Sequence, residues 1–125
     1  MSFAGPRSIR GVRSEPYVCG LDAAMDVVGG KWKALILWAL NQRTHRFGEL
    51  KRAVPGVSEK MLAQQLRELE GDGIVHRAVY DEVPPRVEYS LTEVGVTLNA
   101  ALASLGDWGE ERLTQLGLRP THAAA

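Results

Sequence analysis

The stretch from Phe47 to Arg77 constrains the fold of this chain more than any other, because it predicts a helix, a tight turn, a second helix and a strand in immediate succession. The first helix must end before Pro55, since proline disfavours helical geometry in the residue that precedes it. Pro55-Gly56 then supplies the turn. Ser58 is a favourable N-cap for the second helix, whose apolar stripe is Leu62, Leu66 and Leu69.

The face of the second helix opposite this stripe is polar and basic. Lys60, Gln64 and Arg67 lie together there at 100° per residue, and all three side chains can donate hydrogen bonds. This stretch alone leaves two interpretations open. The segment is a helical hairpin with a solvated outer face, or it is a helix-turn-helix motif whose second helix enters the major groove of DNA.

The composition is that of an ordinary globular protein, since 45% of the residues are hydrophobic and 24% are charged. We therefore expect one domain at residues 17–117, between a flexible arm at 1–16 and a flexible tail at 118–125. No apolar run approaches the roughly 20 residues of a membrane span, and no apolar segment follows the basic N-terminus. We expect a cytoplasmic protein that contacts no membrane.

The distribution of reactive and metal-binding residues argues against an enzyme. Cys19 is the only cysteine, and His45, His76 and His122 are scattered, so we expect neither an intrachain disulfide nor a structural metal. No nucleophile, base and orienting residue cluster, and Gly29-Gly30 is better explained as a helix end than as a phosphate loop. We expect no catalytic site and no cofactor.

The formal net charge is zero. This argues against a non-specific nucleic-acid binder, which is usually strongly basic. It is compatible with a sequence-specific binder that contacts few phosphates per subunit.

Two further helices are predicted before the central stretch. Apolar residues recur at helical spacing from Leu21 to Val28, and Gly29-Gly30 ends that helix. The next helix, from Lys31 to Leu40, is apolar nearly all round and is expected to be core. A short strand is expected at Thr44 to Arg46.

A β-hairpin and a long helix are predicted after the central stretch. Residues 75–81 and 86–91 alternate as two strands, and the prolines of the loop between them should stiffen a protruding tip. Thr92 should cap the last helix. A helix of about 20 residues is ~30 Å long, which is longer than a core of this size can cover. We therefore expect its far end to pack on a second subunit. Gly109 would allow close backbone approach there. The alternative is that Gly106 or Gly109 breaks the helix and the chain folds back.

The order of these elements predicts a mainly α fold with a small antiparallel β-hairpin, that is, a winged helix-turn-helix. In this arrangement the second helix of the motif lies in the major groove and the wing reaches the neighbouring backbone or minor groove. The basic helix face and the proline-stiffened loop would then share one side of the molecule, which favours binding to double-stranded DNA. The alternative is a winged helix that serves as a protein-interaction module without binding DNA.

Several separated motifs also occur in a characteristic order. They are VVGGKWKALILWAL, HRFGELKRAVPGVSEKMLAQQLRELEGDGIVHR, PPRVEYSLTEVG and LGDWGEE. Together, from Tyr17 to about Leu116, they resemble the HxlR-type winged-helix transcriptional regulators of bacteria. The resemblance implies a homodimer that binds operator DNA as a repressor or activator. It further implies dimerisation through the first and last helices, with the interface candidates Leu21, Met25, Leu102, Leu105, Gly109 and Leu113.

The resemblance, together with the helical wheel, implies that the second helix of the motif reads bases. Gln64 can pair bidentately with adenine, and Lys60 or Arg67 with guanine. Ser58 and the helix N-terminus can hold a phosphate. Glu59 can accept a hydrogen bond from cytosine, although a favourable charge in the first helical turn explains it equally well.

The resemblance also implies DNA contacts outside this helix. Arg86 in the wing is the candidate for a minor-groove or backbone contact. Arg46 is the candidate for a phosphate contact, and a surface ion pair with Glu49 is its alternative role. The expected DNA contacts are Arg46, Ser58, Glu59, Lys60, Ala63, Gln64, Arg67, Pro84, Pro85 and Arg86.

Cys19 is the candidate sensor of an oxidant or electrophile. Many members of the resembled family carry a cysteine at the start of the first helix, and a helix N-terminus favours the reactive thiolate. Gly20 stands where the family often has proline, so this chain departs from the family pattern at that position. The alternative is that the cysteine, beside Val18 and Leu21, is an ordinary small buried hydrophobe.

A small aromatic effector is the second way in which activity could be controlled. An apolar cavity near the dimer seam would take such a molecule, whereas the alternative is that the same side chains are dimer core. The candidate lining residues are Tyr17, Met25, Trp32, Trp38 and Trp108.

Overall fold

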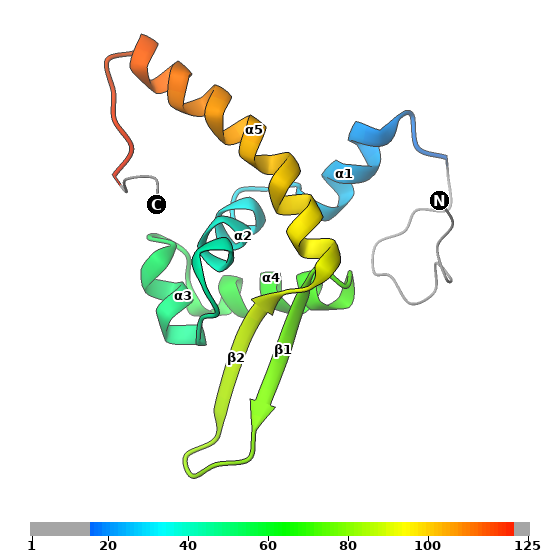
Figure 1. Cartoon of the computed structure of the whole chain (residues 1–125), viewed down its shortest axis with the longest axis vertical. Coiled ribbons are helices and arrows are strands. Elements are labelled where there is room, and N and C mark those ends of the chain that lie inside the picture. Colours follow the sequence, from blue (N-terminus) through cyan, green and yellow to red (C-terminus); the bar gives the residue numbers. More distant parts are fainter. Residues whose placement is uncertain (1–15, 122–125) are drawn as a thin grey trace.

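The computed structural model describes residues 16–121, which form five helices and one two-stranded antiparallel sheet (Figure 1). This order confirms the predicted winged helix-turn-helix. The expected flexible arm and tail lie outside the described residues, except for Pro16 and residues 118–121, which belong to no helix or strand. The elements are α1 (Gly20–Val28), α2 (Lys33–Gln42), α3 (Phe47–Ala53), α4 (Glu59–Gly71), β1 (Val75–Tyr80), β2 (Arg86–Leu91) and α5 (Glu93–Gln115).

Local capping signals set the boundaries of the two helices that matter most for the site. The Ser58 hydroxyl accepts a hydrogen bond of 3.0 Å from the Met61 N–H, as predicted for the N-cap of α4. The Thr92 hydroxyl accepts a hydrogen bond of 3.0 Å from the Gly95 N–H at the start of α5, which confirms the second predicted cap. In the turn between α3 and α4, Gly56 has φ +95°, a conformation that side chains with a Cβ rarely adopt.

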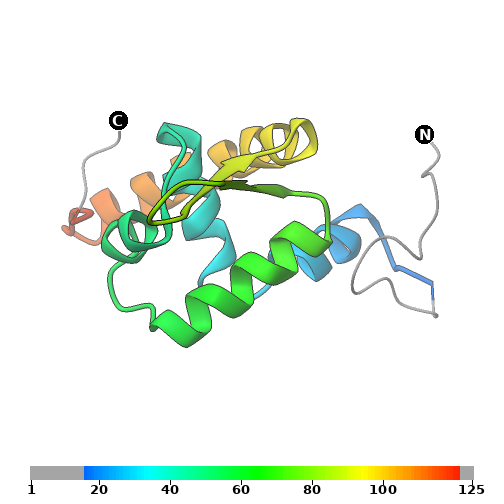
Figure 2. The ribbon, with the colours of Figure 1, turned by 90° about the horizontal axis from the view of Figure 1, so that it is seen from below.

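The core lies where α2 passes between α3, α4 and the hairpin (Figure 2). The predicted stripe of α4 is buried there. Leu35 and Trp38 of α2 were expected in the core, but they are 42% and 37% exposed, because their side of α2 faces a groove beside α5. The buried apolar residues are Val28, Ile36, Leu37, Ala39, Leu40, Leu50, Val54, Val57, Leu62, Leu66, Leu69, Ile74, Val75 and Tyr89.

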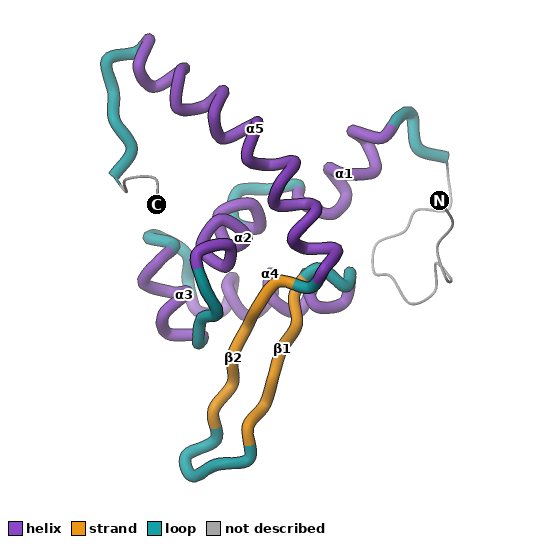
Figure 3. The backbone as a smooth tube through the Cα atoms, viewed as in Figure 1, coloured by secondary structure: helices purple, strands orange, loops and turns teal. Residues whose placement is uncertain are grey.

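The wing is the hairpin of β1 and β2, which projects past the helices (Figure 3). Its antiparallel register pairs Val75 with Leu91 and Tyr80 with Arg86. The strand expected at residues 44–46 is only a single bridge, in which His45 and Tyr89 exchange backbone hydrogen bonds of 3.0 and 2.8 Å. This bridge fastens the segment between α2 and α3 to the base of the wing.

The last helix, α5, runs through Gly106 and Gly109 without interruption, so the alternative of a broken helix is wrong. It ends where Gly117, at φ +73°, lets the Leu118 N–H donate to the Leu113 carbonyl at 2.8 Å. The far half of α5 extends away from the other helices (Figure 1). Within residues 16–121, none of the helices combines the length and apolar character that crossing a bilayer requires.

Candidate nucleic-acid interface

The outer face of α4 and the wing are next to each other on one side of the molecule. In Figure 2, seen from the end at which the wing projects, α4 crosses the molecule beside the hairpin, and no other element covers its outer side. The predicted polar residues of α4 lie on that open side. Ala63 is half-buried, and the exposed members of the set are Ser58, Glu59, Lys60, Gln64 and Arg67.

Gln64 belongs to a chain of polar contacts that reaches into the core. Its Nε2 donates to Glu68 Oε2 at 3.3 Å, and Glu68 Oε1 lies 2.6 Å from Lys33 Nζ. The side chains of Lys33 and Glu68 are 6% and 25% exposed. No role was assigned to either residue from the sequence. A lysine at the start of an otherwise apolar helix was the feature that could have indicated a buried ion pair.

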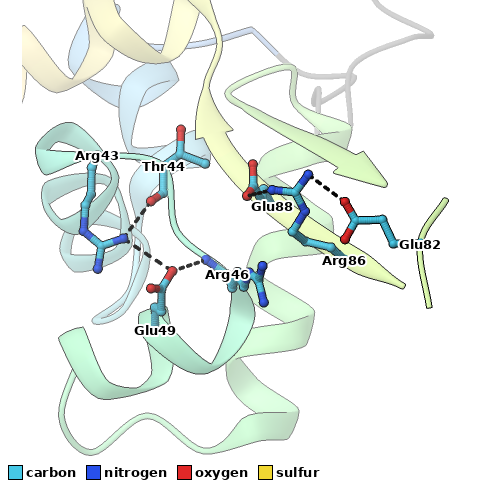
Figure 4. A network of polar contacts seen from close by, with 7 residues as sticks. All are labelled: Arg43, Thr44, Arg46, Glu49, Glu82, Arg86 and Glu88. Atoms are coloured by element: carbon cyan, nitrogen blue, oxygen red, sulfur yellow. Dashed lines mark hydrogen bonds and ion pairs between the residues drawn. The ribbon is translucent and has the colours of Figure 1, made fainter. Parts of the chain in front are cut away.

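Arg46 precedes α3, and its guanidinium points away from Glu49 (Figure 4). The ion pair proposed as its alternative role is wrong, because Glu49 instead lies 3.4 Å from Nη1 of Arg43. Glu49 also accepts a hydrogen bond of 2.8 Å from the backbone N–H of Arg46. That hydrogen bond, and secondly the one from Arg43, lower the pKa of Glu49. The exposed Arg46 side chain therefore remains a candidate phosphate ligand.

Arg86 is held tightly at the base of the wing loop (Figure 4). Its Nη2 and Nη1 lie 3.0 Å from carboxylate oxygens of Glu82 and Glu88, and its guanidinium stacks 4.0 Å from the centroid of Tyr80. Two carboxylates lie against this guanidinium, so a DNA phosphate that approaches Arg86 would also meet their negative charge. Pro84 and Pro85 are exposed at the tip, as expected.

A hollow of about 320 Å³ separates α4 from the wing. Arg67 of α4 and Arg77 of β1 both line it, together with Tyr89, the residue opposite Arg77 in the sheet. Guanidinium groups are well suited to bind a phosphate. Sequence reasoning missed Arg77, because strand alternation does not show that its side of the hairpin faces α4.

Cys19 is exposed and is the N-cap residue of α1. The alternative of a small buried hydrophobe is therefore wrong for this chain. Val18 and Leu21, which lie near it in the sequence, are 90% and 70% exposed.

The residues predicted to form one ligand pocket lie in different places. Trp38 lines a groove of about 390 Å³ between α2 and α5. Trp108 lines a separate, smaller hollow farther along α5. Trp32 packs against the core, with Lys31 Nζ 4.6 Å from its ring centroid. Within one chain Trp38 and Trp108 thus line separate hollows. A cavity shared by these residues at the dimer seam stays a prediction.

The HxlR-like helix-turn-helix family model matches residues 27–116, which include the whole motif, the wing and α5. The chain belongs to this family. Similar proteins include the HTH-type transcriptional regulators YdeP of Bacillus subtilis, 47% identical over 74% of this chain and 73% of YdeP, and YtfH of Escherichia coli, 50% identical over 78% of each chain. The protein is therefore a helix-turn-helix transcriptional regulator.

Solved structures of two relatives in their reduced forms share the fold. The reduced form of the redox regulator HypR covers 79% of this chain and 98% of its own, at 45% identity and a TM-score of 0.74. The reduced form of the transcriptional regulator YodB from B. subtilis covers 75% and 93% at 37% identity and a TM-score of 0.65. Proteins that share this winged fold thus include a redox regulator, HypR.

Proposed function

We propose that this regulator acts in the cytoplasm, binds operator DNA as a homodimer, and changes its affinity for DNA when Cys19 is oxidised or alkylated. The observation that carries the DNA contact is the open, donor-rich face of α4 beside the wing. A recognition helix in the major groove and a wing over the neighbouring backbone or minor groove would use both surfaces together.

The expected contacts divide into base contacts and phosphate contacts. Lys60, Gln64 and Arg67 reach base edges, with Glu59 and Ala63 alongside them. Phosphates are held by Ser58 with the α4 N-terminus, by Arg46 and by Arg77. The wing loop, with Pro84 and Pro85 at its tip, would bring Arg86 to the neighbouring backbone or minor groove.

The homodimer would form through α1 and α5. Single chains expose large apolar side chains on both helices, for example Leu21 at 70%, Met25 at 50% and Leu105 at 64%. Leu102, Gly109 and Leu113 lie on the same long helix and would extend the interface. A two-fold symmetric pair would present two copies of α4 to the two halves of a palindromic operator.

An electrophoretic mobility-shift assay with the chain's own upstream region tests the DNA contact. We expect a salt-sensitive shift, because phosphate contacts release counterions. The absence of a shift at low salt, for reduced and untreated protein alike, would leave the protein-interaction module as the better proposal.

We also expect Gln64→Ala to lower discrimination between operators by about 1–3 kcal/mol. A uniform loss on all sequences would show that Gln64 reads no base.

The signal is tested at Cys19. We expect Cys19→Ser to bind the operator as wild type does but to lose the response to diamide or a quinone, because a hydroxyl is not oxidised or alkylated under these conditions. A response that survives in Cys19→Ser would move the proposal to the second effector mode, a small aromatic ligand. The α2–α5 groove beside Trp38 is the candidate site for it.

A further inference from the structure

The contact between Gln64 and Glu68 determines which end of the Gln64 amide faces outward. Glu68 lies one helical turn after Gln64 and receives its Nε2 at 3.3 Å. On the inner side, the same carboxylate receives the ammonium of Lys33 at 2.6 Å, from the first residue of α2. The Lys33 side chain is only 6% exposed, so water can hardly solvate its ammonium, and the ammonium remains hydrogen-bonded to Glu68.

The chemistry of these groups allows one orientation. A glutamate is a carboxylate at neutral pH and can only accept hydrogen bonds, whereas an ammonium can only donate them. Gln64 can therefore meet Glu68 only with an N–H. Its carbonyl oxygen and its remaining N–H are left to face outward.

An outward pair of one acceptor and one donor distinguishes the purines. In the major groove adenine presents the N7 acceptor and the N6 donor, and this pattern matches such an amide. Guanine presents two acceptors, N7 and O6, and so demands two donors.

We propose that Lys33 and Glu68 are positioning residues that orient the Gln64 amide and thereby make the recognition helix select adenine over guanine. The inference rests on the proposed function, in which Gln64 faces the major groove. Lys33 and Glu68 act only through Gln64 and touch no base themselves.

The substitution Glu68→Gln should reverse the preference. The new amide at position 68 must turn its carbonyl oxygen to the ammonium of Lys33, because that ammonium cannot accept a hydrogen bond. Its NH₂ group then faces Gln64 and donates a hydrogen bond, which Gln64 must accept with its own carbonyl oxygen. Gln64 is left with two N–H donors directed outward, the pattern that guanine requires.

Binding-site selection from a pool of random duplexes, with the full-length protein, measures this preference directly. We expect wild type to select adenine at a position whose preference disappears in Gln64→Ala. At that position Glu68→Gln should favour guanine, with the adenine-to-guanine ratio changed by roughly 5- to 150-fold. Glu70→Gln is the matched control, because it removes the same charge from the exposed side of α4 and should keep adenine.

A second variant covers the case in which Glu68→Gln folds poorly. Lys33→Met combined with Glu68→Ala removes both charges, so neither is left buried without its partner. The Gln64 amide is then free to turn, and the double variant should accept adenine and guanine about equally.

The outcomes separate the inference from the proposed function. An unchanged adenine preference in Glu68→Gln or in the double variant, or the same shift in Glu70→Gln, overturns the positioning role while DNA binding stands. A selection in which no position depends on Gln64 overturns the base contact in the proposed function, and the inference with it.

Discussion

Glu49 shows at the scale of one residue how charge stabilises the start of the motif. Its carboxylate accepts the backbone N–H of Arg46 at 2.8 Å and lies 3.4 Å from Arg43. These contacts, with the backbone hydrogen bond as the larger cause, hold the pKa of Glu49 below its ordinary value of 4.5. The pKa of Glu49 is therefore lower in the folded chain than in the unfolded chain. The carboxylate contributes its full stabilisation at a pH above the ordinary pKa, and this contribution is lost as the pH falls through the pKa of the folded chain.

We therefore expect Glu49→Gln to melt at a lower temperature than wild type at pH 7, because a neutral amide is a weaker partner for both donors. The difference should shrink as the pH falls from 4.5 through the lower pKa of folded Glu49, because the carboxylate is protonated first in the unfolded and then in the folded chain. Thermal unfolding followed by circular dichroism between pH 3 and pH 7 measures it. A difference that is the same across this range would show that the carboxylate charge contributes nothing.

Lys33 gives a second residue-scale prediction. Lys33→Ala removes the partner of Glu68, and we expect the free energy of unfolding to fall by about 2–3 kcal/mol, somewhat less than for a fully buried pair because Glu68 is 25% exposed. Lys31→Ala, an exposed lysine two residues earlier, should cost less than about 1 kcal/mol. Urea denaturation of both variants provides the comparison, and equal losses would mean that the pair adds no stability.

The caps and the ion pairs differ in how far the sequence could predict them. Ser58 and Thr92 bond to backbone N–H groups three residues away, so a local pattern is sufficient to predict them. Lys33 and Glu68 are 35 residues apart, and their contact depends on how α2 packs against α4. Helical periodicity carries no information on that packing.

At the scale of elements, α5 is fixed to the rest of the fold by a close contact at its first turn. A Cβ added to Gly95 would lie 2.2 Å from the carbonyl oxygen of Ile74. That carbonyl cannot move aside easily, since it also accepts the Thr92 N–H at 3.1 Å. Gly95 thus lets α5 begin directly against the segment that leads into β1.

We expect Gly95→Ala to lower the free energy of unfolding by about 1–3 kcal/mol, because the helix must shift away from Ile74. Gly106→Ala is the matched control in the same helix. No atom lies within 4 Å of its added Cβ, and alanine is the better helix former, so it should stabilise by up to about 1 kcal/mol. Chemical denaturation of both variants tests this, and a stabilised Gly95→Ala would contradict the proposed contact.

Element types followed from the sequence more readily than the directions in which elements face. Hydrophobic periodicity predicted all five helices, and alternation predicted both strands. A helix that is apolar nearly all round has no preferred side, however, so the exposure of Leu35 and Trp38 could not be read from α2. The same limit explains why Arg77 was missed on β1.

At the scale of the whole molecule, the described chain leaves much apolar surface uncovered. Val18, Leu21 and Met25 around α1 and Leu105 and Trp108 on α5 are each at least half exposed. Large apolar side chains that are exposed in groups mark candidate interaction surfaces. The excess length of α5 is the sequence feature that led to the prediction of a second subunit at its far end.

We expect Leu105→Asp to produce a monomer at micromolar concentrations, because the interface would have to bury an unpaired carboxylate. Val83→Asp makes a similar change at the tip of the wing, where the valine is fully exposed, and should leave the dimer intact. Sedimentation velocity separates the two variants.

The same variant should bind its operator more weakly. Because a monomer can engage only one half of a palindromic operator, the operator affinity of Leu105→Asp should fall by ~10²-fold or more. A dimeric Leu105→Asp would place the interface away from the middle of α5 and would require another explanation for the length of this helix.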